Sequence, residues 1–193
     1  MALPLELPLD HPKLLSLSVG TRVALHGRVI TAGAEVHRQL EAGEKLPDDL
    51  GEGVVLVHAR PQLVRKGKKW RVISLEPEAS AGYEAQIPQW LSQRQVRGFL
   101  GYGGFSEAAF EQFRRFTGCY FQTFSGTGPA LADCVLSAEE IPFGNGLKGP
   151  DAMWSLELQG LPAVVTMDLQ GRSLHRLIAE GSGRRFAALD PIT

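Results

Sequence analysis

The sequence predicts an α/β protein built on a mixed sheet with flanking helices. Short apolar runs alternate with helix-like segments through the middle of the chain, and strand-like runs lie towards both ends. The 193 residues suffice for one domain with a hydrophobic core, and 44% hydrophobic with 21% charged residues is typical of a globular protein. We therefore expect residues 1–193 to form a single domain, with a loose N-terminal segment at 1–14 and a C-terminal tail at 179–193.

The first half of the chain has its clearest signal at residues 53–59. This nearly continuous apolar run is rich in valine, which is the pattern of a strand buried on both faces, so we expect Val54 to Val57 at the centre of the sheet. The expected elements of this half are strands at 23–30, 53–59 and 70–75 and a helix at 34–44. The basic turn at 65–69 indicates a solvated hairpin.

Proline, glycine and serine delimit the elements of the second half. Pro88 suits the first turn of a helix, and Ser106 is a favourable N-cap with Glu107 at the positive end of the following helix. The expected elements are a helix at 88–95, a strand at 96–100, a helix after Ser106, a strand at 120–124, a helix at 130–135, and strands at 163–167 and 174–178 joined by a tight turn at 168–171.

Charge and hydropathy exclude several classes of partner. The formal net charge is −1, so no strong field attracts nucleic acid or an anionic membrane. No apolar run reaches the length of about 18 residues that spans a bilayer. The first residues carry prolines and an acid instead of the basic start and apolar block of a signal peptide. The sequence therefore predicts a cytoplasmic protein without a nucleic-acid or membrane partner.

Four segments resemble the beta region of iron–sulphur-dependent hydro-lyases, the fumarate hydratase and tartrate dehydratase type. Residues 149–168 resemble the family run G-P-E-A-I-W-x-L-x-V-x-D-F-P-A-I-V-V-I-D, and residues 27–37 resemble G-T-I-x-T-A-R-D-x-A-H. Residues 77–84 fall where the family has P-T-T-x-x-R-M-D, and residues 100–106 where it has I-G-K-G-x-R-S. The resemblance spans roughly residues 15–178. It implies a swivelling β/β/α domain that adds water to, or removes it from, a small hydroxy acid.

The resemblance also implies that cationic site positions are replaced. Gly33 and Gly82 stand where the family has arginines, Tyr102 stands where it has lysine, and Glu78 replaces a threonine. A dicarboxylate is costly to bury without paired cations, so these exchanges disfavour such a ligand. Because the frame is retained, we expect eight site-lining residues around one cavity mouth: Gly33, His37, Glu78, Ser80, Gly82, Tyr102, Gly103 and Ser106.

Some of these residues have two interpretations. His37 is either a ligand-orienting group or a helix histidine satisfied by the backbone. The loop at 101–106 is either an anion site at a helix start or a tight turn. Tyr102 either projects into a cavity as a hydrogen-bond donor or proton carrier, or fills the space that the family lysine would occupy. The catalytic residues stay unassigned.

Only two cysteines, Cys119 and Cys134, are present. An iron–sulphur cluster normally takes three or four protein thiolates, so this chain is predicted to bind no cluster and no metal. The cluster that the resemblance implies would be supplied by an alpha partner. Two functions remain open: the beta subunit of a hydro-lyase, with a non-standard substrate, and an inactive relative that binds a ligand or a partner. A homodimer is also left open.

Overall fold

Nine strands form one mixed sheet in the computed structural model, which describes residues 1–93 and 95–187. Their order across the sheet is β1-β2-β3-β6-β7-β9-β8-β5-β4. The strands are β1 (Leu3–Glu6), β2 (Arg22–Thr31), β3 (Val54–Val57), β4 (Gln62–Lys66), β5 (Lys69–Ser74), β6 (Val96–Gly101), β7 (Cys119–Gln122), β8 (Val135–Ile141) and β9 (Met153–Met167). The α/β character with flanking helices is as the sequence predicts.

The long strand β9 closes part of this sheet into a ring. Strands β2, β3, β6 and β7 run parallel to one another, and β9 pairs antiparallel with both β2 and β7. Where β9 passes β2, Leu25 pairs with Leu161 and His26 with Gln159, so Gly160 is the extra residue of a bulge, with φ of +76°. A left-handed residue at a bulge requires glycine in most cases and bends the strand. This bend lets one strand reach several partners.

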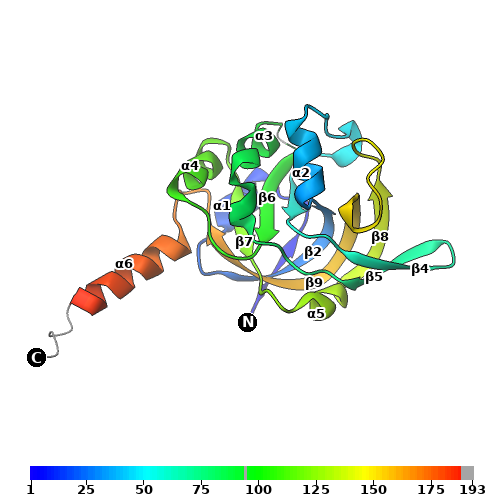
Figure 1. Ribbon diagram of the computed structural model, residues 1–193. Helices are drawn as coiled ribbons and strands as arrows, with labels where there is room; N and C mark the ends of the chain where they lie inside the picture. Colours follow the sequence, from blue (N-terminus) through cyan, green and yellow to red (C-terminus); the bar gives the residue numbers. More distant parts are fainter. Residues whose placement is uncertain (94, 188–193) are drawn as a thin grey trace, which may run out of the picture.

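Helices α2 (Ala34–Glu41), α3 (Ile87–Ser92) and α4 (Glu107–Arg115) lie together on one side of the ring (Figure 1). Strand β3 is buried along its whole length. Val54 and Leu56 belong to the apolar cluster that includes residues of these helices, whereas Val55 and Val57 belong to a second cluster with Val29, Phe121 and others. A strand covered on both faces explains the valine-rich run, and the prediction for Val54–Val57 is confirmed.

The structure differs from the expectation of a loose segment at 1–14. Strand β1 pairs in parallel with β2, and the following helix α1 (His11–Ser16) is capped by the Asp10 carboxylate, which accepts the Lys13 N–H at 2.8 Å. Leu5, Leu9 and Leu14 are buried. These isolated leucines among prolines give no local periodicity, so their burial depends on the sheet edge that they cover.

The expected strand at 174–178 is wrong. These residues begin helix α6 (Leu174–Ala187), which extends away from the rest of the molecule (Figure 1). Leu174, Leu177 and Ile178 have the spacing of a helix face, but five residues are too few to separate this period from that of a strand. Residues 179–187 of the expected tail are helical, and 188–193 lie outside the described part of the chain.

Three further elements also differ from the predicted pattern. The segment β8 was not predicted as a strand, β9 begins ten residues before the expected start at 163, and α5 (Gly128–Ala132) begins two residues before the expected 130. The helices expected at 34–44 and 88–95 are present but shorter, and Ser106 is the N-cap of α4 as predicted. No helix in the described ranges combines the length and the hydropathy needed to cross a membrane.

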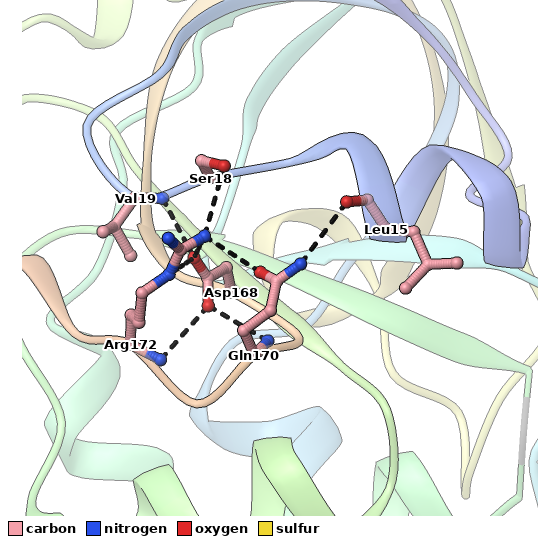
Figure 2. A network of polar contacts seen from close by, with 6 residues as sticks. All are labelled: Leu15, Ser18, Val19, Asp168, Gln170 and Arg172. Carbon is pink, nitrogen blue, oxygen red and sulfur yellow. Dashed lines mark hydrogen bonds and ion pairs between the residues drawn. The ribbon is translucent and has the colours of Figure 1, made fainter.

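The predicted tight turn at 168–171 is present and is organised by Asp168 (Figure 2). The Asp168 side chain is fully buried. Its Oδ1 accepts the N–H groups of Gln170 and Arg172, each at 3.1 Å, and its Oδ2 accepts the Val19 N–H at 3.1 Å and the Arg172 Nε at 2.8 Å. Arg172 also donates to Ser18 Oγ at 3.2 Å. One carboxylate thus joins the end of β9 to the N-terminal segment.

Candidate functional site

The candidate site lies where the parallel strands end. Gly33 follows β2, Arg60 follows β3 and Tyr102 follows β6, and the carboxyl ends of parallel strands meet at one edge of a sheet. Residues 77–80 run between the last two of these ends. Glu78 N donates to His58 O at 2.7 Å, Tyr102 N to Glu78 O at 3.2 Å and Ser80 N to Tyr102 O at 3.1 Å. The sheet geometry therefore joins segments that are far apart in the sequence.

An arginine that no sequence motif singled out occupies this edge. Arg60 Nε donates to Glu78 Oε1 at 2.8 Å, and Arg60 Nη1 lies 3.6 Å from Asp151 Oδ1. The hydrogen bond to Glu78 and the two nearby carboxylates raise the pKa of Arg60. The Tyr83 hydroxyl donates to the other oxygen of Glu78, and burial together with this bond raises the pKa of Tyr83. Arg60 is therefore balanced by two carboxylates of the same chain.

Arg60 also takes the space beside Gly33. A Cβ atom added at Gly33 would overlap Cγ of Arg60 and would lie 2.9 Å from its Cδ. The stem of Arg60 is therefore packed where a side chain at position 33 would begin. By contrast, a Cβ added at Gly82 would meet open space, and Gly82 is exposed. The two glycines at proposed arginine positions thus have different surroundings.

Two histidines and a tyrosine form a ring cluster beneath this ion pair. His37 stacks on Tyr83 with ring centroids 4.1 Å apart, and His58 lies 5.2 Å from His37 and 4.9 Å from Tyr83. Trp90 Nε1 donates to His37 Nδ1 at 3.2 Å. Burial lowers the pKa of His37 to about 3, and burial together with the neighbouring His37 lowers the pKa of His58. Both rings are therefore neutral at neutral pH.

Ser80 connects His58 to Tyr120 inside the same cluster. The Ser80 hydroxyl lies 2.8 Å from His58 Nδ1 and 3.0 Å from the Tyr120 hydroxyl, which also donates to Gly103 O at 3.1 Å. Ser80 is fully buried, and burial raises the pKa of Tyr120. A Cβ added at Gly101 would overlap Ser80 Oγ. Glycine at 101 thus makes room for this polar chain.

The loop at 101–106, which the sequence suggests as an anion site, and the Gly-rich loop before α5 bind carboxylates of the protein itself. At the start of α4, Glu84 accepts the Ser106 N–H at 2.5 Å and the Ser106 hydroxyl at 2.6 Å. At the loop before α5, Glu76 accepts the N–H groups of Gly126 at 2.5 Å and Gly128 at 2.9 Å. These backbone bonds lower the pKa of Glu76. Both loops can hold an anion, and each already holds one.

These contacts join six of the eight predicted site residues: Gly33 through Arg60, His37 through Tyr83, Gly103 through Tyr120, and Glu78, Ser80 and Tyr102 directly. Gly82 precedes Tyr83 in the sequence, and Ser106 is bound by Glu84, which follows Tyr83. Side chains, above all Tyr83 and Arg60, occupy the region between them. Hollows lie elsewhere on the molecule, including one of about 450 Å³ lined by Arg28, Asp49, Ser137, Glu139, Ser155 and Glu157. The functional role of the eight residues stays a prediction.

Sequence reasoning missed His58, Tyr83 and Tyr120 as members of the site, and no motif singles out Arg60. His58 lies in an apolar run typical of a buried strand, Tyr83 falls at the methionine position of the motif at 77–84, and Tyr120 begins an expected strand, so none of the three has a site residue's signature. A positional signal for His58 and Arg60 exists, because both come directly after a strand buried on two faces. No such signal links Tyr83 to His37.

Comparison with known proteins assigns the chain to a family. The sequence profile described as "Fumarase C-terminus" matches residues 3–178. The chain belongs to this family. It is 29% identical over 164 residues to a putative L(+)-tartrate dehydratase subunit beta of Methanocaldococcus jannaschii, which covers 82% of this chain and 84% of that protein. It is 27% identical over 190 residues to the L(+)-tartrate dehydratase subunit beta of Escherichia coli K12, covering 97% and 92%.

A third relative of the Fumarase C-terminus family is longer. The chain is 28% identical over 182 residues to a putative fumarate hydratase class I of Geobacillus stearothermophilus, and the match covers 92% of this chain but 34% of that protein. The chain therefore spans about a third of this relative and most of the two beta subunits.

The cysteines of this family member are poor candidates for a metal cluster. Cys119 lies on β7 and is buried, and Cys134 lies between α5 and β8. Burial raises the pKa of both thiols, and the nearby Asp168 and Asp133, respectively, raise them further, so the thiolate that binds metal is disfavoured. The described ranges contain no group of three or more His, Cys, Asp or Glu placed to hold a metal ion. The two thiols are fewer than the three or four that an iron–sulphur cluster normally takes from its protein.

Proposed function

We propose that the chain is the beta-subunit-like component of a hydro-lyase of the fumarate and tartrate dehydratase type, in which a separate alpha subunit carries the iron–sulphur cluster. The family assignment and the two beta-subunit relatives support this role. The two unsuitable cysteines support placing the cluster on another chain. In this proposal the fold acts as a swivelling β/β/α domain that presents the edge around Arg60 to the partner.

The proposed substrate is a small hydroxy acid that carries fewer negative charges than a dicarboxylate. The ion pair of Arg60 with Glu78, to which Asp151 adds a second carboxylate, supports this substrate class. A second carboxylate of a ligand would find Arg60 already paired with two carboxylates and would be repelled by Glu78. Each charge-assisted hydrogen bond that such a ligand lacks weakens its binding by roughly 1.5–3 kcal/mol. A single carboxylate could compete with Glu78 for Arg60, whereas two could not both be paired.

Co-purification with a cluster-bearing alpha subunit and an assay of water addition or removal test this function. Complex formation is first established by gel filtration, and turnover is then compared for fumarate, malate and tartrate and for hydroxy acids with one carboxylate. We expect turnover only among the latter. Rapid turnover of an ordinary dicarboxylate by the wild-type complex would refute the proposed substrate class, and failure to bind any alpha subunit would refute the subunit role.

A second candidate function is a non-catalytic module that binds a ligand or a partner. The feature that favours it is that Glu76, Glu78 and Glu84 each occupy a position able to hold an external anion. In a protein that no longer binds an acidic substrate, these glutamates can occupy the anion-binding positions without loss of function. An alpha complex that forms normally but turns over none of the tested hydroxy acids would favour this candidate.

A further inference from the structure

Two buried ring nitrogens at the centre of the cluster have no hydrogen-bond partner among the described residues. His37 is 2% exposed and His58 is 0% exposed, and the Nε2 atom of each is buried and unpaired within that part of the chain. Buried polar atoms in native proteins are paired in about 90% of cases or more, with protein or with ordered water. Two unpaired atoms on neighbouring rings therefore call for a shared partner.

The partner of His37 fixes which of its nitrogens carries the proton. The Trp90 indole is only a donor, and it donates to His37 Nδ1. Nδ1 must therefore be the unprotonated nitrogen of the neutral ring, and the proton lies on Nε2. The unpaired atom of His37 is thus a hydrogen-bond donor.

The polar chain around Ser80 fixes the opposite arrangement in His58. The Gly103 carbonyl can only accept, so Tyr120 donates to it, and the Tyr120 oxygen then accepts the Ser80 proton. The Ser80 oxygen in turn accepts the proton of His58 Nδ1. With the proton of the neutral ring on Nδ1, the unpaired Nε2 of His58 is a hydrogen-bond acceptor.

We propose that His37 and His58 form a binding site for one hydroxyl oxygen, which accepts from His37 Nε2–H and donates to His58 Nε2. A hydroxyl is the group that both accepts and donates through a single atom. The ring centroids are 5.2 Å apart, so the two rings are close enough for one oxygen to form a hydrogen bond of about 2.8 Å with each. A carboxylate has no proton for His58 Nε2, and the neutral rings offer it no charge.

The occupant is water in the free protein and the hydroxyl of a small alcohol or hydroxy acid in the bound state. Tyr83 covers both rings, at 4.1 Å from His37 and 4.9 Å from His58, so a ligand enters when Tyr83 moves. This site does not depend on the proposed hydro-lyase function or on an alpha subunit. It rests only on the two assigned tautomers and the buried unpaired atoms.

Nitrogen NMR of the full chain labelled with ¹⁵N-histidine tests the tautomers. We expect the proton on Nε2 for His37 and on Nδ1 for His58. Trp90→Phe assigns the first ring and Ser80→Ala the second, because each change removes the hydrogen-bond partner of one ring. The same tautomer on both rings, or a positively charged ring at pH 7.5, would overturn the proposal.

Titration with ethylene glycol, with acetate as the matched anion, tests the ligand class. We expect a saturable shift of both Nε2 signals with ethylene glycol and none with acetate, while exposed His11 serves as the internal control. His58→Phe removes the acceptor and should weaken the glycol response about 2- to 10-fold, the effect of one hydrogen bond. A saturable response to acetate, or a glycol response of unchanged strength in His58→Phe, would overturn the proposal.

A crystal structure at high resolution distinguishes water from a dry site. An ordered oxygen within hydrogen-bond distance of both Nε2 atoms in the free protein, replaced by a glycol oxygen after soaking, is the expected result. An ordered water that glycol does not displace would support the hydroxyl site and refute its ligand-binding role. An empty space, or direct contact between the two rings, would refute the site itself.

Discussion

Asp168 and Glu78 each pair with an arginine, yet the two carboxylates have different surroundings. Asp168 is fully buried and accepts three backbone N–H groups as well as the Arg172 side chain (Figure 2). Glu78 is 22% exposed and is bound through the side chains of Arg60 and Tyr83. A carboxylate held by backbone donors fixes the path of the chain, whereas one held by side chains mainly decides what else can bind there.

The largest effect is expected for Asp168→Asn. The variant loses the negative charge that accepts several buried hydrogen bonds, so we expect the free energy of unfolding to fall by about 3 kcal/mol. This value is the lower end of the range for breaking a buried ion pair, because Arg172 is half exposed. Urea denaturation measures the change. Asp133→Asn, at an exposed position, is the control and should change stability by less than about 0.5 kcal/mol. Equal effects would remove the distinction between the two kinds of carboxylate.

The neutral histidines predict a loss of stability in mild acid. Below pH 6.5 the unfolded chain takes up a proton on His37, whereas the folded chain takes it up only near pH 3. The contribution of His37 to the free energy of unfolding is therefore complete above pH 6.5 and falls as the pH drops. The slope is about 1.4 kcal/mol per pH unit, or about 2 kcal/mol between pH 6.5 and 5. His58 acts in the same direction.

Denaturation curves between pH 7.5 and 5 measure this slope. His11→Asn, which changes an exposed histidine, should leave it unchanged. A free energy of unfolding that stays constant over this range would contradict the burial of His37 and His58 as neutral rings.

Gly33→Arg tests whether Arg60 really occupies the space beside position 33. We expect a loss of stability towards the lower end of about 1–3 kcal/mol, because overpacking is partly relieved when the half-exposed Arg60 moves outward. Arg60→Gly should restore most of the loss in the double variant. Gly82→Arg, at an exposed position with open space, is the matched control and should stay within about 0.5 kcal/mol of wild type. Additive stability changes for Gly33→Arg and Arg60→Gly would show that the side chains at positions 33 and 60 do not compete for the same space.

The smallest effect on stability and the clearest effect on binding are expected for Glu78→Gln. The free energy of unfolding should change by less than about 1 kcal/mol, because Arg60 is half exposed. Arg60 loses its nearest carboxylate, so acetate should raise the melting temperature of this variant by more than that of wild type. Glu111→Gln, which removes an exposed pair with Arg114, should give no acetate response. An equal response in wild type would show that Glu78 does not shield Arg60.

Local signals account for the elements that the sequence predicted well. The valine run of β3, the Ser106 cap of α4 and the turn after β9 each depend on a few neighbouring residues. The elements that were missed depend on distant partners. Strand β1 is defined by pairing with β2, and the first ten residues of β9 by pairing with β2 and β8. For α6, neighbouring residues were simply too few to set the period.

The sequence by itself determined the family frame, the buried centre of the sheet and the segments that meet at its edge, because these follow from residue type and spacing. Only the tertiary structure decided how the edge is filled. Arg60 beside Gly33, Glu78 on Arg60, and Tyr83 over His37 and His58 are contacts between different loops. Such contacts depend on how parallel strands place their ends, which no local pattern records.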